Sequence, residues 1–170
     1  MSVRGQGAFS MVEVVIAVSV LAVAVATVLA LLPLLTREMA DSGDSLVAQR
    51  FSGAIEAEMR RLAGSGSLDT LATSIKPSDA SSTLTLVAPR DGRDVREESA
   101  SDVEEWAQYF AIELWQFSTP PLAYERAVGA VLPVQVRVSW PYKLRAQDGG
   151  AVRTEIEDRS SITFTVSLRR

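Results

Sequence analysis

Glu13 is the residue whose type and position most clearly indicate a chemical role. It is the one charged side chain between Phe9 and Leu35. A carboxylate inside an apolar stretch of this kind costs several kcal/mol at bilayer depth unless a cation pairs with it. The chemistry that Glu13 can offer is therefore ion pairing with a positively charged group that enters the same apolar surroundings.

Other kinds of chemistry are excluded by composition. The chain contains no Cys, no His and no Asn, which excludes disulfides, thiolate and imidazole metal sites, cysteine nucleophiles, histidine triads and Asn-linked glycans. A serine nucleophile would need one of the two lysines, Lys76 or Lys143, as its base, and neither lies in a Ser-x-x-Lys pattern. We expect no enzyme, no catalytic residue and no cofactor.

A polar region at 89–105 is the remaining place where side chains could do chemistry. The adjacent Glu104 and Glu105 suggest an acid–base pair, and a cation site would use Asp91, Asp94 and Glu97. No calcium-loop spacing is present, and arginines alternate with the acids. The sequence therefore favours a solvated loop, with a bound cation as the open alternative.

The element that carries Glu13 has the length of a membrane span. Residues 14–35 form a run of 22 residues without charge, which as a helix is about 33 Å long and enough to cross a bilayer. Pro33 lies near its end and predicts either a kink, because proline removes a helical hydrogen bond, or the end of the membrane helix.

The residues around Glu13 resemble a known processing motif. The stretch Gly7-Ala8-Phe9-Ser10-Met11-Val12-Glu13-Val14 is similar to the prepilin-type cleavage and methylation motif of the type IV pilin-like and pseudopilin family, in which Gly precedes a Phe-Thr-Leu-Ile-Glu-Val-like start. The resemblance implies that a prepilin peptidase cuts before Phe9 and methylates its new amine. It covers about 30 residues and departs from the family at Ala8, where Gly is usual.

Two cleavage positions follow from that departure. Cleavage between Ala8 and Phe9 makes Glu13 the fifth mature residue, as in the family, whereas cleavage between Gly7 and Ala8 makes it the sixth. A free amine is positively charged at neutral pH. When buried among helices it needs a counter-ion, and the hypothesis is that Glu13 supplies one to the Phe9 amine of an adjacent subunit. The alternative is a glutamate near the interface of an ordinary signal anchor.

Beyond the apolar run the pattern predicts an amphipathic continuation of the same helix. Apolar residues recur at three- and four-residue spacing up to Leu62, and the stripe of Phe51, Ile55 and Met59 is expected to face the core. The segment 41–44, Asp-Ser-Gly-Asp, predicts a break because these residues are poor in helix interiors. Gly64 is expected to end the helix.

The rest of the chain reads mostly as strands. Alternating or aromatic-rich segments predict strands at 83–87, 106–117, 134–140 and 162–168. A short helix is expected at 67–75, with Ser67 as its N-cap, and a hairpin in the turn-rich segment 141–158. An antiparallel sheet with one apolar face can bury that face on the amphipathic helix.

We therefore expect an α+β, pilin-like fold, with one long N-terminal helix at about 10–62, membrane-spanning in its first half, packed on a small antiparallel sheet. The expected organisation is a leader peptide at 1–8, a transmembrane and assembly helix at 9–35, its amphipathic continuation at 36–63 and a strand-rich extracytoplasmic head at 64–170. Before assembly the chain would cross the inner membrane once, with the head in the periplasm.

The function that the resemblance implies is structural. The chain would be a minor pilin or pseudopilin of a type IV pilus or type II secretion-like filament. Its partners would be the prepilin peptidase, other pilin subunits, the inner-membrane assembly platform and the lipid bilayer, with no nucleic acid expected because the surface is mildly acidic. Weaker similarities connect the sequences ALLPLL and VRVSWP to prepilin-like proteins of Verrucomicrobia gene cassettes. The alternative is a monomeric membrane-anchored binding or adaptor domain.

Overall fold

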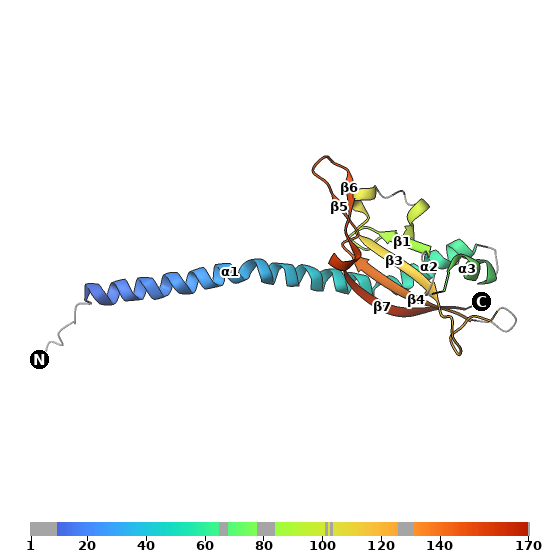
Figure 1. Cartoon of the computed structure of the whole chain (residues 1–170), viewed down its shortest axis with the longest axis horizontal. Helices are drawn as coiled ribbons and strands as arrows, with labels where there is room; N and C mark the ends of the chain where they lie inside the picture. The colour runs from blue at the N-terminus through green and yellow to red at the C-terminus, as the bar shows by residue number, and fades with distance from the viewer. Residues whose placement is uncertain are drawn as a thin grey trace, which may run out of the picture. The chain divides into compact units, whose positions relative to one another are not determined.

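Two compact units make up the chain, and they divide between Asp41 and Ser42. The computed structural model (Figure 1) describes residues 10–64, 68–77, 84–100, 102, 104–125 and 131–169. The first unit contains most of one long helix, and the second is a head in which helices pack on an antiparallel sheet. The predicted α+β class, with an N-terminal helix ahead of a small sheet, is confirmed.

The N-terminal helical region consists of α1 (Met11–Gln49) and α2 (Phe51–Ala63). They are separated by Arg50, whose N–H donates to the Val47 carbonyl at 3.0 Å in a tight three-residue turn. The predicted helix at about 10–62 is thus present, with one residue's interruption.

The break predicted at 41–44 is wrong, because α1 stays helical through this segment. Asp44 is 7 % exposed, and its carboxylate accepts hydrogen bonds from Arg90 at 3.0 and 3.1 Å and from the Tyr109 hydroxyl at 2.8 Å. These tertiary contacts offset the poor local helix propensity, which is a weak preference that packing commonly overrides.

The end of α2 is as predicted. Gly64 has a φ of +57°, which favours glycine, and its N–H donates to the carbonyls of Arg60 and Arg61. The short helix α3 (Leu68–Ser74) follows, close to the predicted 67–75. The proposed cap, Ser67, lies outside the described residues.

A five-stranded antiparallel sheet forms the other layer of the head. Its strand order is β2-β1-β3-β4-β7. The strands are β1 (Leu84–Ala88), β2 (Arg96–Glu97), β3 (Phe110–Gln116), β4 (Val131–Trp140) and β7 (Ser160–Arg169). A separate hairpin pairs β5 (Lys143–Arg145) with β6 (Ala151–Arg153), and the 3₁₀ turns are η1 (Glu98–Ala100), η2 (Glu105–Ala107) and η3 (Ile156–Asp158).

The strand predictions at 134–140 and 162–168 are confirmed, as is the hairpin within 141–158. The strand predicted at 106–117 begins only at Phe110, because Trp106 belongs to η2. Trp106 does not enter the sheet. The guanidinium of Arg145 from β5 instead lies over its ring, 5.0 Å from the ring centroid. Trp106 therefore links the η2 turn to the β5–β6 hairpin.

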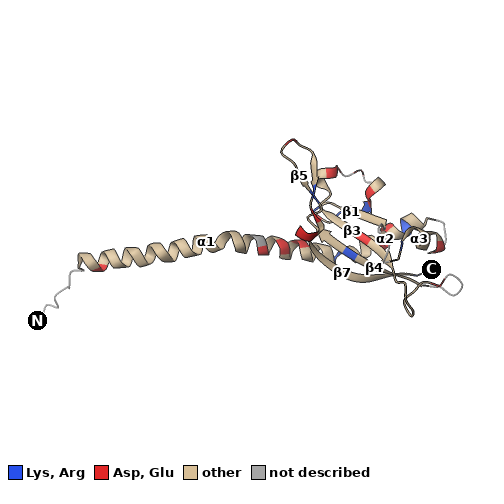
Figure 2. Cartoon of the chain, viewed as in Figure 1, with Lys and Arg blue, Asp and Glu red and all other residues tan. Residues whose placement is uncertain are grey.

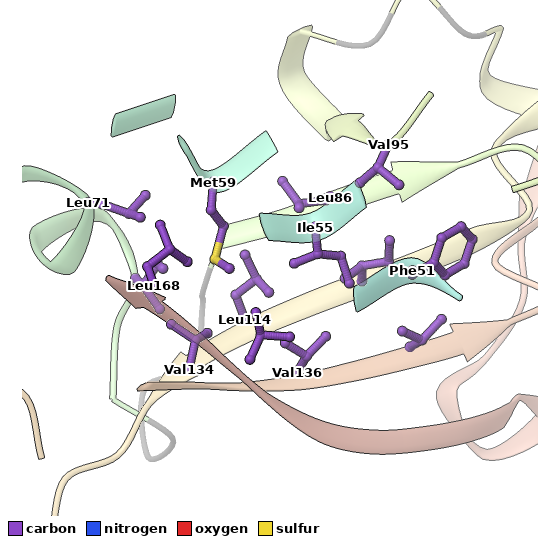
Figure 3. Packing of buried hydrophobic residues seen from close by; sticks show 14 of the residues in the cluster. Phe51, Ile55, Met59, Leu71, Leu86, Val95, Leu114, Val134, Val136 and Leu168 are labelled. Atoms are coloured by element: carbon purple, nitrogen blue, oxygen red, sulfur yellow. The ribbon is translucent and has the colours of Figure 1, made fainter. Parts of the chain in front are cut away.

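The core lies between α2 and one face of the sheet (Figure 3). Phe51, Ile55 and Met59 are at most 1 % exposed, which confirms the predicted core stripe. They meet every second residue of the central strands, and the fully buried members there are Ile112, Leu114, Leu132, Val134, Val136 and Val138. The apolar strand face, which repeats every two residues, thus packs on the apolar helix face, which repeats every three to four residues.

Candidate functional site

The first half of α1 is apolar and exposed along its whole length. Its large apolar side chains are about half exposed or more, from Met11 at 85 % to Leu35 at 52 %. Soluble monomers seldom show a continuous apolar surface of this size. By its length and composition, α1 is long and apolar enough to span a membrane.

Three of the four polar side chains in 11–36 satisfy their hydrogen bonds within the helix. The hydroxyls of Ser19 and Thr27 donate to the carbonyls of Val15 and Val23, each at 2.8 Å. Thr36 donates likewise to the carbonyls of two residues in the preceding turn, Leu32 and Pro33, at 3.1 and 3.0 Å. Such internal hydrogen bonds allow hydroxyl groups to lie in lipid at low cost.

Glu13 is the fourth polar side chain, and it differs from the other three. It lies in the first turn of α1 and is exposed. No residue that the structure describes forms an ion pair with its carboxylate. Figure 2 shows how nearly free of charged side chains the first half of α1 is. Glu13 is thus the charged group of this segment that needs a partner from outside it.

Ser10 of the processing motif has a structural role at the start of α1. The backbone N–H of Glu13 donates to Ser10 Oγ at 3.3 Å, so Ser10 caps the start of α1. The spacing Ser-x-x-Glu is the signal of a capping box, and it could have been read from the sequence. The cap lies three residues before Glu13, and α1 begins at Met11.

Pro33 lies inside α1, which continues without interruption to Gln49. The chain therefore stays helical beyond Pro33. The kink and the end of the membrane-embedded part at this residue both stay predictions. The candidate cleavage and methylation residues Gly7, Ala8 and Phe9 lie outside the described residues.

The polar region at 89–105 has mostly exposed charged side chains, as the sequence favoured, but part of it also packs on the helices. Residues 89–97, here called the strap, lie against the end of α1 and the start of α2 at Gly92 and end in β2. Val95 within the strap is 3 % exposed. Its Arg90 forms a two-pronged pair with the buried Asp44 of α1 and lies over the Tyr109 ring at 4.9 Å. The hydrogen bonds to the Asp44 carboxylate raise the pKa of Arg90. The strap is therefore bound to α1 by an ion pair as well as by packing.

A second pair binds the strap to α2. Glu58 is 2 % exposed and accepts two hydrogen bonds from Arg61, both at 2.7 Å, while Arg96 of the strap lies 3.5 Å away. The hydrogen bonds from Arg61 lower the pKa of Glu58, and the charges of Arg61 and Arg96 lower it further.

The lowered pKa of Glu58 predicts a pH dependence of stability. A carboxyl group whose pKa is lower in the folded state stabilises the fold above its unfolded pKa, and this contribution is lost as the pH falls through the folded value. Wild type should exceed Glu58→Gln in free energy of unfolding at pH 7, and the gap should shrink below about pH 4. Urea titrations of both proteins at pH 7, 5 and 3 measure this gap, and a gap independent of pH would contradict the assignment.

The cation site considered at Asp91, Asp94 and Glu97 is not formed. Asp91 lies 3.7 Å from Arg93, and Asp94 lies 3.8 Å from Arg96. Within the described ranges, no three acidic side chains converge in a way that could hold a metal ion.

The acid–base and nucleophile alternatives gain no support from the geometry. Glu104 and Glu105 are both exposed at the start of η2. Lys143, one of the two lysines, is held by Glu98 at 3.3 Å and by the Gln108 amide oxygen at 2.9 Å.

Comparisons of the chain with family models, with curated proteins and with solved structures gave no match.

Proposed function

We propose that the chain is a pilin-like structural subunit, a minor pilin or pseudopilin of a type IV pilus or type II secretion-like filament. The observation that carries the proposal is the state of Glu13. Between residues 11 and 36, the exposed apolar part of α1, it is the one charged residue, and the other polar side chains there donate hydrogen bonds to carbonyls of the same helix. A carboxylate in that setting requires a cation from another molecule.

The cation in this proposal is the amine that cleavage before Phe9 would create on a neighbouring subunit. Ser10 caps α1 and so fixes Glu13 within its first turn, four residues after Phe9 in the sequence. Two such helices side by side can place the amine of one beside the carboxylate of the other. Each charge then neutralises the other in a region without water.

In this proposal the subunit passes through insertion, processing and assembly. The chain is inserted once in the inner membrane through α1, with its head in the periplasm, and is processed by a prepilin peptidase. The assembly platform then moves it from the bilayer into a filament of similar subunits. The head does not need to catalyse a reaction in this role.

Glu13→Ala tests the proposal. It should leave membrane insertion intact and lower incorporation into filaments at least about tenfold, because the amine of the neighbour would lie unpaired among apolar helices; tenfold corresponds to about 1.4 kcal/mol. Quantitative immunoblots of membrane and sheared-filament fractions give the ratio.

Thr27→Ala is the matched control, because Thr27 is polar, lies on the same helix and donates its hydroxyl hydrogen bond to the Val23 carbonyl of that helix. It should be incorporated like wild type. Normal incorporation of Glu13→Ala would reject the pairing. Absence of the wild-type chain itself from the filament fraction would favour the monomeric membrane-anchored binding or adaptor domain.

A further inference from the structure

The outer face of the sheet, opposite α2, carries a small polar cavity. Ser139 of β4 lies on this face, beside Ala111 of β3 and Ser161 of β7 in the strand register. The segment after β4 folds back over the face, and Tyr142 packs there on Val87 and Ala111. On the same face lies a cavity of about 30 Å³ lined by Glu113, Arg137, Ser139, Ile156, Arg159 and Ser161.

A hydroxyl group without a partner lies in the wall of this cavity. Ser139 is 4 % exposed, and its Oγ makes no hydrogen bond with any residue that the structure describes. A buried hydroxyl without a hydrogen bond is unfavourable. Its presence at a cavity indicates that something else accepts or donates the missing bond.

The three charged side chains that line the cavity, Glu113, Arg137 and Arg159, have a net charge of +1. Arg137 and Glu113 neutralise each other through hydrogen bonds of 2.6 and 2.8 Å. Arg159 donates to the Thr154 carbonyl and lies 4.9 Å from the centroid of the Tyr142 ring, and no carboxylate of the described residues forms an ion pair with it. Burial lowers the pKa of Arg159, and the nearby positive charge of Arg153 lowers it further. An anion would relieve both effects.

The size of the cavity limits what that anion can be. One water molecule needs about 10–15 Å³ of such space, so a cavity of about 30 Å³ has room for about two oxygen atoms. A guanidinium group with free N–H donors suits a carboxylate, whose two oxygens accept hydrogen bonds in one plane.

We infer that this cavity is a binding site for a single carboxylate group, held by Arg159 and by the hydroxyl of Ser139. The group can belong to a small free acid or to an acidic side chain of a neighbouring polypeptide. The site belongs to the head alone, so it can exist whether or not α1 acts in filament assembly.

Acetate is the probe for the first experiment, which uses the full-length chain in detergent micelles. Thermal unfolding is followed by tryptophan fluorescence while acetate replaces chloride at constant ionic strength. We expect acetate to raise the unfolding temperature of wild type in a saturable way. The apparent dissociation constant should rise at least about tenfold in Arg159→Gln, because a charge-assisted hydrogen bond is lost, and severalfold in Ser139→Ala.

Arg153→Gln is the matched control. Arg153 stacks on the same Tyr142 ring at 5.0 Å and carries the same charge, but it does not line the cavity. It should bind acetate like wild type. An unfolding temperature that is the same in acetate and chloride would overturn the inference and leave a cavity that holds water only. Equal weakening in Arg153→Gln and Arg159→Gln would overturn it too, because it would show general screening of charge. Since Ser139→Ala removes only a hydroxyl, it keeps the test valid if Arg159→Gln fails to fold.

The source of the carboxylate is settled by photocrosslinking in membranes from expressing cells. A benzophenone side chain is placed at the exposed Thr163, which lies opposite Arg137 in the register of β4 and β7. An adduct with another polypeptide that disappears in Arg159→Gln identifies an acidic side chain of a neighbour. Acetate binding without such an adduct identifies a small free acid.

Discussion

Phe51→Ala is expected to lower the free energy of unfolding of the head by about 3–5 kcal/mol, because it leaves a cavity at the centre of the core. Phe51 is 1 % exposed, and its ring packs edge-to-face on Phe110 with centroids 5.0 Å apart. The three tryptophans, Trp106, Trp115 and Trp140, all lie in the head. Urea unfolding of the full-length chain in detergent, followed by tryptophan fluorescence, therefore reports on the head.

Leu46→Ala is the control for this prediction. Leu46 is also a large apolar residue of the helical layer, but it is 59 % exposed, so its truncation should change the free energy of unfolding by about 0.5 kcal/mol or less. Equal losses in the two variants would show that the core does not lie beneath Phe51.

Gly92→Ala is expected to destabilise the head by about 2–4 kcal/mol. Gly92 has a φ of +72°, where a Cβ is strained. The added Cβ would also lie 2.7 Å from Val47 Cγ1 and 3.4 Å from Phe51 Cε1. The strap would have to move away from the helical layer, and the same urea titration measures the loss.

Gly149→Ala separates the effect of backbone strain from that of the steric clash. Gly149 has a φ of +87°, but its Cβ would meet nothing within 4 Å, so this variant carries backbone strain alone, about 1 kcal/mol. Adding Val47→Ala to Gly92→Ala should recover the steric part. If Gly92→Ala costs no more than Gly149→Ala, the close approach of the strap to the helical layer is refuted.

The parts of the fold that could be predicted are those with a local period. The alternation of Val134, Val136 and Val138 predicts a strand with one buried face, and the spacing of Phe51, Ile55 and Met59 predicts a buried helix face. Both patterns depend only on the geometry of a single element, and both are confirmed.

The strap could not be predicted in this way, because its contacts are distant in sequence. Arg90 pairs with Asp44 across 46 residues, and Arg96 with Glu58 across 38. Read locally, alternating arginines and acids are typical of a solvated loop. Their partners are fixed only when the sheet brings β1 and β2 beside the helices.

The functional features also differ in how far they can be predicted from local sequence. The position of Glu13 in an apolar run is visible in the sequence, and so is the Ser-x-x-Glu spacing of the Ser10 cap. The cavity around Ser139 was not visible. The alternation of β4 places Ser139 on the polar face, but its cover comes from Arg159, which a separate hairpin returns to the sheet.

The central claim is that Glu13 receives the freed amine of Phe9 from a neighbouring subunit, and the mature N-terminus tests it most directly. Mass spectrometry of the full-length gene product isolated from membranes of cells that contain a prepilin peptidase should show a chain beginning at N-methylated Phe9. A chain that retains Met1 to Ala8 would contradict the claim, because the amine that Glu13 is proposed to neutralise would not exist.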